Sequence, residues 1–431
     1  MKFGVTLILG YALGVSTALG NPKLDCSTIA NDYCNLNCLP NIAGRCGSDL
    51  MVALKDGPGS DKMRCYSPST LNDDQTKYVD GDCYCTRDEA LTSLVEECEQ
   101  DVETVFASGM DNAACYRIPS IIQTPDGALL AFAEQRLSDC GDNGQNNIVL
   151  RRRENRSAWG EILMVAESDG TAYSNANPAI VYDSDGKWSI LLHFDTMNNP
   201  SSTRIGKNMQ TWSNDGGKTW EEPVEITDFF PPASQGCMPG PALGVQNNVE
   251  GHPLNGRIYF NCHSGNAGND HVMYWSDDMG KTWIVGEPLG SQFNECMHGL
   301  LPSSNSSVIM NCRTTAAMGR AEFFFDPELN QDGEAIFVEG LDDAGCMGSI
   351  IVREGEGGED IVYQSNAVGP SRTHLTVKKS SDSGKTFDAG LLVWEGPSAY
   401  SMLVDTGDEI GLLLELGVKG PYEAIGYAVV G

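Results

Sequence analysis

Three copies of one short pattern constrain what this 431-residue chain can fold into. They are SNDGGKTW at 213–220, SDDMGKTW at 276–283 and SSDSGKTF at 380–387. Each copy is typical of a hairpin tip, with an Asp that accepts backbone N–H bonds, a Gly that takes the left-handed conformation, and a final aromatic that returns between strands. The copies therefore indicate a repeat architecture and have a structural, not a catalytic, role.

The spacing of these boxes predicts the number of repeats. The first two begin 63 residues apart and the last two 104 apart, so the longer gap holds two units of about 52 residues, a plausible length for a four-stranded blade. One box is therefore missing from this gap. Before the first full box, RRRENRSAWGE at 151–161 is a degenerate box in which Trp159 supplies the aromatic. The 316 residues from Tyr116 to Gly431 provide room for about six blades. We expect an all-β, six-bladed β-propeller.

Short β-rich runs support this architecture, and most are bounded by Gly, Asp, Asn or Pro. No stretch after residue 116 has a helical period. The runs lie at 120–124, 128–134, 147–153, 188–194, 257–262, 307–312, 334–340, 361–366, 375–380 and 409–416.

The front of the chain differs in composition from the rest. Residues 1–20 have the pattern of a secretory signal peptide, which predicts a secreted or lumenal protein. Residues 21–110 form a small Cys-rich module with too few large apolar residues for a sizeable core, so disulfides are expected to stabilise it. It contains one helical candidate, at 88–105, and the propeller is expected over 111–431. Its eight cysteines are Cys26, Cys34, Cys38, Cys46, Cys65, Cys83, Cys85 and Cys98.

The other seven of the fifteen cysteines follow residue 100. Disulfides are expected in a secretory chain, but an odd number means that one thiol is free or pairs with the front module. Cys296 and Cys312 are expected on two antiparallel strands. A disulfide between them and two buried thiols are equally compatible with the sequence.

The formal charge of −31, from 28 basic and 59 acidic residues, argues against nucleic acid or an acidic membrane as a partner. An anionic substrate would need a local basic cluster. No other apolar stretch reaches membrane-spanning length, and the six His lack metal-site spacing, so no metal or cofactor is expected. Two sequons on predicted turns, at Asn155 and Asn305, are candidate glycan acceptors.

The chain from Tyr116 onward resembles the exo-α-sialidase (neuraminidase) family. The motifs that carry the resemblance are Arg-Ile-Pro at 117–119, FAEQR at 132–136, an Asp-x-Gly loop, IVLRR at 148–152 and the repeated Asp-boxes. Their order and spacing together are specific, and the Cys-rich front is not covered. The resemblance implies a glycoside hydrolase that removes terminal sialic acids from glycoproteins, glycolipids or oligosaccharides.

By this resemblance, three arginines bind the substrate carboxylate: Arg117, Arg313 and Arg372. Guanidinium groups suit this task because they hold a carboxylate bidentately. Although the three lie far apart in the sequence, the strands nearest a propeller axis converge at one end of the channel. Any one of them, taken without its motif, is as well explained by an exposed ion pair of little energetic value.

The resemblance places the nucleophile at Tyr400 and its base at Glu295. A neutral phenol avoids the repulsion that a carboxylate nucleophile would meet from the substrate's own carboxylate. Because an unperturbed phenol has a pKa of about 10, it needs a base to attack near neutral pH. A core or rim aromatic is the structural alternative for Tyr400.

The acid that protonates the leaving oxygen is assigned to Asp142 in DCGDNGQN, with Asp139 as its rival; an Asp in such a loop is otherwise a turn-former. Glu415 matches the carboxylate that orients the first arginine. Arg136, with Glu134, is a candidate for contacting substrate, and a structural pair across a strand is the alternative. Residues 237–246 resemble a segment at the floor of the site, and 177–178 are the candidates for recognising the acyl-amino group.

The expected activity is therefore that of a retaining exo-sialidase. Two alternatives remain at this point. The first is a propeller that binds glycans without cleaving them, since Asp-boxes also occur in receptors and unrelated hydrolases. The second is a trans-sialidase, which would use the same residues but pass the sugar to an acceptor other than water.

Overall fold

The computed structural model describes residues 102–197, 206–230, 237–264, 271–290, 292–314, 319–355, 358–369 and 371–431, together with the backbone of 51–54, 62–66 and 84–86. The chain divides into two compact units, Met1–Asp101 and Val102–Gly431. In the first, β1 (Met51–Leu54), β2 (Lys62–Tyr66) and β3 (Tyr84–Thr86) form an antiparallel sheet. The predicted signal peptide and most of the Cys-rich module lie outside the described residues. Within the described residues, no helix combines the length and apolarity needed to cross a bilayer.

The second unit consists almost entirely of antiparallel strands, grouped into blades in chain order. Blade 1 contains β5 (Cys115–Gln123), β6 (Leu129–Arg136), β7 (Asn146–Arg153) and β8 (Ile162–Ala166). Blade 2 contains β9 (Ala172–Tyr182), β10 (Trp188–Met197), β11 (Gly206–Ser213) and β12 (Val224–Glu225). Blade 3 contains β13 (Cys237–Pro239), β14 (Val245–Gln246), β15 (Ile258–Ser264), β16 (His271–Ser276) and β17 (Ile284–Val285).

The remaining strands form three more blades, so that the described residues make six in total. Blade 4 contains β18 (Phe293–Leu301), β19 (Ser307–Thr314), β20 (Ala321–Phe325) and β21 (Ile336–Phe337). Blade 5 contains β22 (Ser349–Arg353), β23 (Ile361–Ala367), β24 (Thr373–Ser380) and the first part of β25 (Leu391–Asp405). Blade 6 contains the rest of β25, β26 (Ile410–Leu416), β27 (Ala424–Val429) and β4 (Glu103–Ala107). Three short 3₁₀ turns lie at Met110–Asn112, Thr227–Phe229 and Pro302–Ser304.

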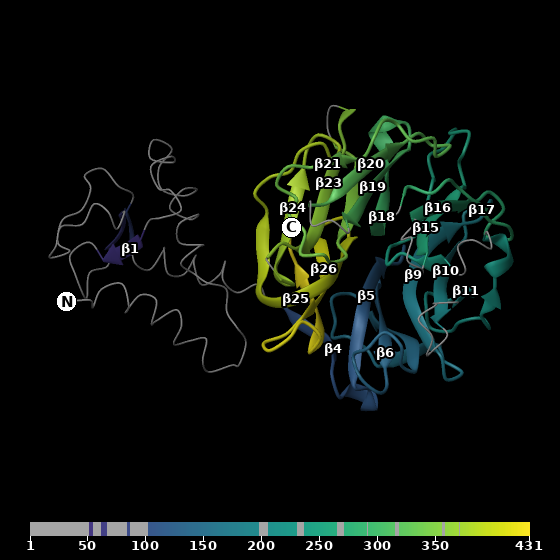
Figure 1. Ribbon diagram of the computed structural model, residues 1–431, viewed down its shortest axis with the longest axis horizontal. Coiled ribbons are helices and arrows are strands. Elements are labelled where there is room, and N and C mark those ends of the chain that lie inside the picture. Colours follow the sequence, from purple (N-terminus) through teal and green to yellow (C-terminus); the bar gives the residue numbers. More distant parts are fainter. Residues whose placement is uncertain are drawn as a thin grey trace. The chain divides into compact units, whose positions relative to one another are not determined.

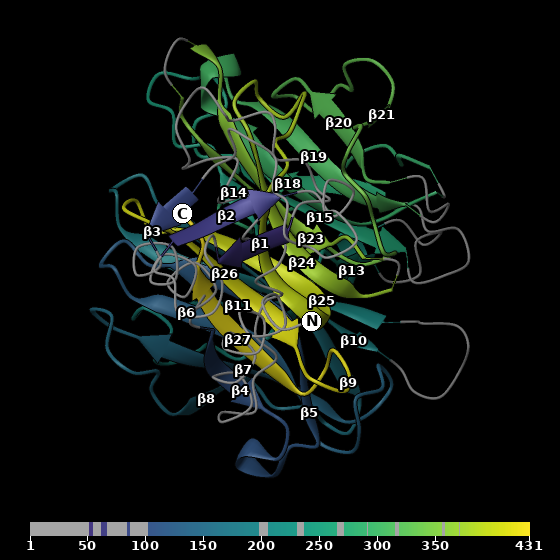
Figure 2. The same cartoon turned by 90° about the vertical axis from the view of Figure 1, so that its left-hand side faces the viewer.

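The ring closes through strands from opposite ends of this unit. The first strands of neighbouring blades contact each other, except that blade 3 meets β18 through β15, and β25 contacts β5 (Figure 1). β4 completes blade 6 by pairing with β27 (Figure 2). Residues 103–107, expected to lie in the Cys-rich module, are therefore part of the propeller. The last residues of the helix expected at 88–105 are in β4 instead, because pairing with the open edge of β27 satisfies their backbone groups.

The Asp-boxes form the predicted tips between the third and fourth strands of their blades. In the first box, Asp215 accepts bonds from the backbone N–H groups of Lys218 and Thr219 at 3.0 and 2.9 Å. Asp278 makes the same contacts with Lys281 and Thr282. The tip of blade 4, at 326–335, is where the box is missing, as the spacing predicted.

Three tryptophans, at the ends of the first two boxes and in the degenerate box, pack against the preceding blade. Trp283 of blade 3 contacts His193 of blade 2 edge-on, at a centroid distance of 4.7 Å, and Trp220 of blade 2 contacts Phe132 of blade 1 at 5.9 Å. Trp159 in the degenerate box packs against Tyr427 of blade 6 at 5.7 Å. Since burial of an aromatic side chain contributes about 2 kcal/mol, these residues help to hold neighbouring blades together.

Three disulfides cross-link the propeller: Cys115–Cys140, Cys237–Cys262 and Cys296–Cys312. The last pair, which the sequence left open, is thus a disulfide between β18 and β19. Cys346 is the free cysteine of the described residues, and it is buried. Both sequon asparagines are exposed and lie on turns, as predicted.

Candidate active site

Irregular strand pairing distinguishes the end of the propeller where the candidate residues lie. The register of β5 shifts between Arg117 and Ser120, that of β18 between Asn294 and Met297, and that of β25 between Ser398 and Ser401. At two of these positions a non-glycine residue has positive φ, with Ile118 at 57° and Glu295 at 45°. Bulges of this kind re-aim side chains and are frequent beside active sites.

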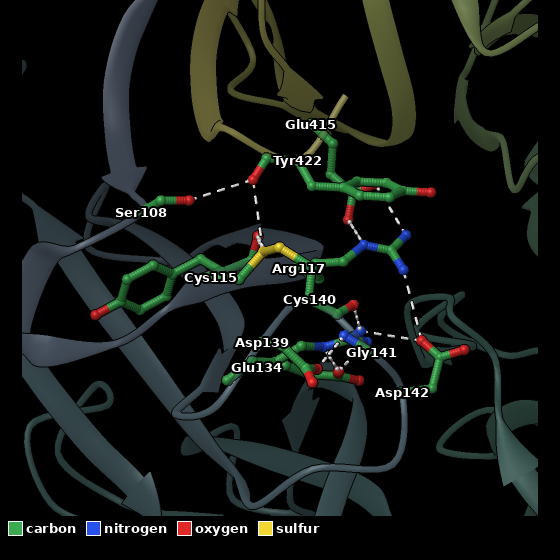
Figure 3. The surroundings of a disulfide bond; sticks show 12 residues. Ser108, Cys115, Arg117, Glu134, Asp139, Cys140, Gly141, Asp142, Glu415 and Tyr422 are labelled. Carbon is green, nitrogen blue, oxygen red and sulfur yellow. Dashed lines mark hydrogen bonds and ion pairs between the residues drawn. A yellow bond between two sulfur atoms is a disulfide. The ribbon is translucent and has the colours of Figure 1, made fainter. Parts of the chain in front are cut away.

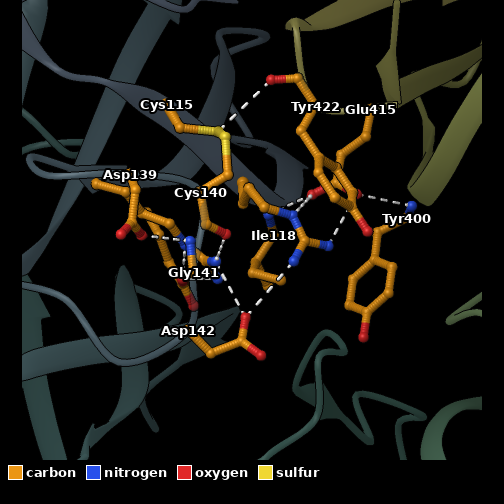
Figure 4. Close-up of polar contacts among 12 residues, drawn as sticks. Cys115, Ile118, Asp139, Cys140, Gly141, Asp142, Tyr400, Glu415 and Tyr422 are labelled. Atoms are coloured by element: carbon orange, nitrogen blue, oxygen red, sulfur yellow. Dashed lines mark hydrogen bonds and ion pairs between the residues drawn. A yellow bond between two sulfur atoms is a disulfide. The ribbon is translucent and has the colours of Figure 1, made fainter. Parts of the chain in front are cut away.

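Glu415 on β26 satisfies the backbone groups that two of the bulges leave unpaired. Its carboxylate accepts bonds from the N–H of Ile118 at 2.9 Å and from that of Tyr400 at 3.1 Å. It also accepts from Arg117 Nε at 3.0 Å and Nη2 at 3.2 Å. Glu415 is fully buried. One carboxylate thus fixes the first arginine and joins the first and last blades (Figure 4).

Tyr400 and Glu295 face each other from β25 and β18. The phenol of Tyr400 donates a hydrogen bond to Glu295 Oε1. Glu295 Oε2 accepts from Arg313 Nη1 at 2.5 Å, and Arg313 lies on β19 directly opposite Asn294. This arrangement joins a phenol, a carboxylate and a guanidinium in one chain of contacts.

The protonation of this chain suits a nucleophile and its base. Burial raises the pKa of Tyr400 well above its ordinary value, and the charge of Glu295 adds to the effect, so the phenol is neutral at rest. Burial is the largest influence on Glu295 and acts to raise its pKa, but the charges of Arg313 and His263 and the hydrogen bonds from Tyr400 and Arg313 together outweigh it, and the net pKa is lowered. Glu295 is therefore ionised and able to take the phenolic proton.

The three predicted arginines surround Tyr400. The guanidinium carbon of Arg117 lies 5.2 Å from the centroid of the Tyr400 ring, and that of Arg372 lies 5.6 Å from it. Arg313 approaches through Glu295. Burial alone would lower the pKa of Arg313, but Glu295 raises it, so its positive charge is secure. A cationic cluster thus exists within a strongly acidic chain, where it can hold an anionic group.

Asp142 lies in the loop between β6 and β7, beside the first arginine (Figure 3). Its Oδ1 is 3.5 Å from Arg117 Nη1 and 3.0 Å from Arg136 Nη1, and its side chain is 47% exposed. The rival residue Asp139 has the role of a turn-former, since its Oδ1 accepts the N–H of Gly141 at 2.6 Å. Of the two aspartates, Asp142 is thus the one placed beside the arginine cluster.

Arg136, a predicted substrate contact, is buried in a network with its own strand and loop. Its Nε and Nη2 donate to Glu134 Oε2 at 2.9 and 2.6 Å, and its Nη1 donates to the carbonyl of Cys140 at 2.6 Å. Glu134 in turn accepts the N–H of Asn175 at 2.9 Å, at another positive-φ residue. Arg136 therefore has both the strand pairing weighed from the sequence and a contact with Asp142.

Tyr422 is a residue of this site that sequence reasoning missed. It lies in the loop after β26, where its hydroxyl accepts from Arg372 Nη1 at 2.6 Å. The guanidinium carbon of Arg117 is 4.0 Å from the centroid of its ring. Tyr422 thus contacts two of the three arginines. Its setting in the sequence, GPYE, indicates only a turn, so no local signal could have identified it.

The structure gives the surroundings of two further predicted elements. Asn177 is fully buried and its Oδ1 accepts the N–H of Ala242 at 2.9 Å, so it supports the backbone. Gln246, expected near the site floor, lines a cavity of about 700 Å³ together with Gln123, at the opposite end of β5 from Arg117. No cluster of three or more His, Cys, Asp and Glu side chains in the described residues is arranged to hold a metal ion.

Comparison with known proteins identifies the family. The profile of the BNR repeat-like domain matches residues 127–413. A sialidase of Micromonospora viridifaciens is 27% identical over 357 residues, which cover 77% of this chain and 54% of the relative. This chain belongs to the sialidase family.

Solved structures of sialidases share the fold of this family member. A Hadza microbial sialidase has a TM-score of 0.65 at 19% identity, covering 86% of this chain and 73% of its own. The leech intramolecular trans-sialidase complexed with 2,7-anhydro-Neu5Ac has a TM-score of 0.61 at 14% identity, covering 88% and 82%. This sialidase-family protein thus has the sialidase propeller, and it spans about half the length of the Micromonospora relative.

Proposed function

We propose that the protein is a retaining exo-α-sialidase that hydrolyses terminal sialic acids from glycoproteins, glycolipids or oligosaccharides. The observation that carries this proposal is the hydrogen bond from Tyr400 to Glu295 within a cluster of three arginines. A glycan-binding module has no need of an ionised base beside a buried phenol. The family relationship points to the same chemistry.

In the proposed first step, Tyr400 attacks the anomeric carbon while its phenolic proton passes to Glu295. The glycosidic C–O bond breaks, and Asp142 gives its proton to the departing oxygen. Arg117, Arg313 and Arg372 hold the substrate carboxylate during the reaction. The product of this step is a tyrosyl-linked sialic acid, with Asp142 now ionised.

In the second step, Asp142 accepts a proton from water as the water oxygen attacks the anomeric carbon. The bond to Tyr400 breaks, and the phenolate recovers its proton from Glu295. Two inversions at the same carbon return the sugar with its original configuration. Tyr400, Glu295 and Asp142 are all restored to their starting protonation.

A secreted or lumenal location is part of the proposal. The three disulfides of the propeller are typical of an oxidising compartment. The exposed asparagines of both sequons are accessible to glycosylation. Mass spectrometry of protein from an expressing eukaryotic cell's medium would show cleavage near residue 20, and an uncleaved N-terminus would contradict this part.

The stereochemistry of the product tests the mechanism. Hydrolysis of 3′-sialyllactose followed by proton NMR should release the α-anomer first, before mutarotation, and a 2,3-difluoro sialic acid should label Tyr400 covalently. First release of the β-anomer, or labelling at another residue, would contradict the tyrosyl intermediate. Product analysis with 4-nitrophenyl α-sialoside as donor and excess lactose as acceptor separates the alternatives. Formation of sialyllactose indicates a trans-sialidase, 2,7-anhydro sialic acid indicates intramolecular transfer, and no turnover over a broad pH range indicates a binding module.

A further inference from the structure

The disulfide Cys115–Cys140 lies between two parts of the proposed catalytic machinery. Cys115 begins β5, two positions before Arg117, and Cys140 lies two positions before Asp142 in the loop at 137–145 (Figure 3). Asp142 is therefore attached through this covalent bond to the strand that carries the first arginine. Such a connection limits how far the loop can move from the arginine cluster.

A second attachment acts on the same short stretch of loop. Arg136 Nη1 donates both to the carbonyl of Cys140 and to Asp142, at 2.6 and 3.0 Å. The guanidinium is itself held by Glu134, and both side chains are about 1% exposed. The residues of this loop are half-buried or exposed, and two further bonds lie within it, from Leu137 N to Gln145 O at its base and from Gly141 N to Asp139.

We infer that the Cys115–Cys140 disulfide, together with Arg136, positions the Asp142 carboxyl to protonate the leaving group. This inference rests on the proposed function. The disulfide is inferred to act on the reaction through Asp142, because Cys115 is fully buried. The disulfide is thus expected to assist proton donation by Asp142 specifically, in addition to stabilising the fold.

The leaving group of the substrate reveals such a role. Lactose leaves from 3′-sialyllactose only with proton assistance, whereas 4-nitrophenolate leaves from 4-nitrophenyl α-sialoside without it. Loss of positioning should therefore reduce kcat/KM far more for 3′-sialyllactose than for the aryl sialoside. A purely structural loss would reduce both by the same factor.

The chain offers a matched control. Cys115–Cys140 and Cys237–Cys262 both join residues 25 positions apart, so the chain-entropy effect of removing either is the same. Only the first is connected to the Asp142 loop. The double variants Cys115→Ser/Cys140→Ser and Cys237→Ser/Cys262→Ser should therefore show similar losses in Tm.

The experiment compares the ratio of the two kcat/KM values in four proteins: wild type, Asp142→Ala and the two double variants. We expect Asp142→Ala to lose on the order of 10²–10³-fold more on 3′-sialyllactose than on the aryl substrate. Cys115→Ser/Cys140→Ser should lose roughly tenfold more, and Cys237→Ser/Cys262→Ser should keep the wild-type ratio. If Asp142→Ala shows this selectivity but Cys115→Ser/Cys140→Ser does not, the inference is overturned and the proposed function stands. If Asp142→Ala shows none, the assignment of the acid fails, and the inference with it.

Chemical reduction of the Cys115–Cys140 disulfide in the native protein gives the same test and does not depend on the folding of a double variant. Among the disulfides that the structure describes, Cys140 is the one sulfur partner that is not buried, so reductants reach this bond first. Mild reduction, alkylation and peptide mapping should show loss of selectivity for 3′-sialyllactose in proportion to labelling of Cys140. Full labelling with an unchanged ratio would overturn the inference.

Discussion

Tyr400 on β25 donates a hydrogen bond to Glu295 on β18, although the two residues lie 105 positions apart in the chain. The bond joins blade 4 to the junction of blades 5 and 6. Both residues sit at irregular positions of their strands, and Arg313 and Glu415 hold them from either side. Their function therefore depends on the closed ring.

Replacement of Tyr400 by Phe removes the oxygen proposed as the nucleophile and little else. We expect kcat on 3′-sialyllactose to fall by about 10²–10⁴-fold, while an unsaturated sialic acid analogue binds within about twofold of wild type because the three arginines remain. Steady-state kinetics and calorimetry measure the two quantities. Tyr363→Phe, at a half-buried tyrosine on β23 outside the site, is the control and should leave both unchanged. Near wild-type turnover by Tyr400→Phe would contradict the assignment of the nucleophile.

We expect Glu295 to set the acidic limb of the pH profile, that is, the fall of kcat/KM at low pH. Because its pKa is lowered, the carboxylate stays ionised, and kcat/KM is maintained, until the pH falls below the ordinary Glu value of about 4.3. Arg313→Gln removes the positive charge that lowers the pKa of Glu295, so burial should then raise that pKa. The acidic limb of the kcat/KM profile should therefore move toward neutral pH. Arg353→Gln, which breaks contacts with Asp405 and with the carbonyls of Gly407 and Glu409, all outside the site, serves as the control. An unmoved limb in Arg313→Gln would show that another group sets it.

Tyr422 is expected to orient Arg372. Tyr422→Phe removes the hydroxyl that accepts from this arginine but keeps the ring beneath Arg117. Because one such hydrogen bond contributes about 0.5–1.5 kcal/mol, KM for 3′-sialyllactose should rise roughly 2–10-fold with little change in kcat. A lower KM would mean instead that the hydroxyl competes with the substrate carboxylate for Arg372.

Glu322 on β20 links stability to pH. Burial raises its pKa to about 8, and Glu322 Oε2 has no hydrogen-bond partner. Since the unfolded chain ionises near pH 4.5 and the folded one near 8, the stability contributed by the neutral form is complete below 4.5 and is lost as pH rises through 8. Glu322→Gln should therefore be increasingly more stable than wild type over this window, by on the order of 1 kcal/mol per pH unit. Thermal unfolding of both proteins from pH 5 to 9 measures the difference, and a constant difference would contradict the raised pKa.

Much of the propeller was predictable because its signals are local. An Asp-box needs only its own Ser, Asp, Gly and aromatic residues to form its turn, and so its spacing indicated the blades and even the blade without a box. Strands 129–136 and 410–416 were likewise recognisable from composition. Strand β9 was missed as a run, since its polar residues 174–177 interrupt the β-rich pattern.

The candidate site was only partly predictable. Arg117, Glu295 and Tyr400 stood out because each lies in a motif of the family. Arg136 did not reveal its contact with Asp142, and the free position of Cys346 could not be read from an odd count of cysteines. The Arg136–Asp142 contact and the pairing of a cysteine both depend on which distant residues become neighbours in the folded chain.

The amino-acid sequence by itself determined the repeating unit, the approximate number of blades and the residue types available for the chemistry, because turns and strands form from interactions between near neighbours. Only the tertiary structure decided that β4 closes the ring, that a disulfide links the Asp142 loop to β5, and that Tyr422 contacts two arginines. The physical reason is that these contacts join distant segments, whose meeting depends on how six blades pack around one axis.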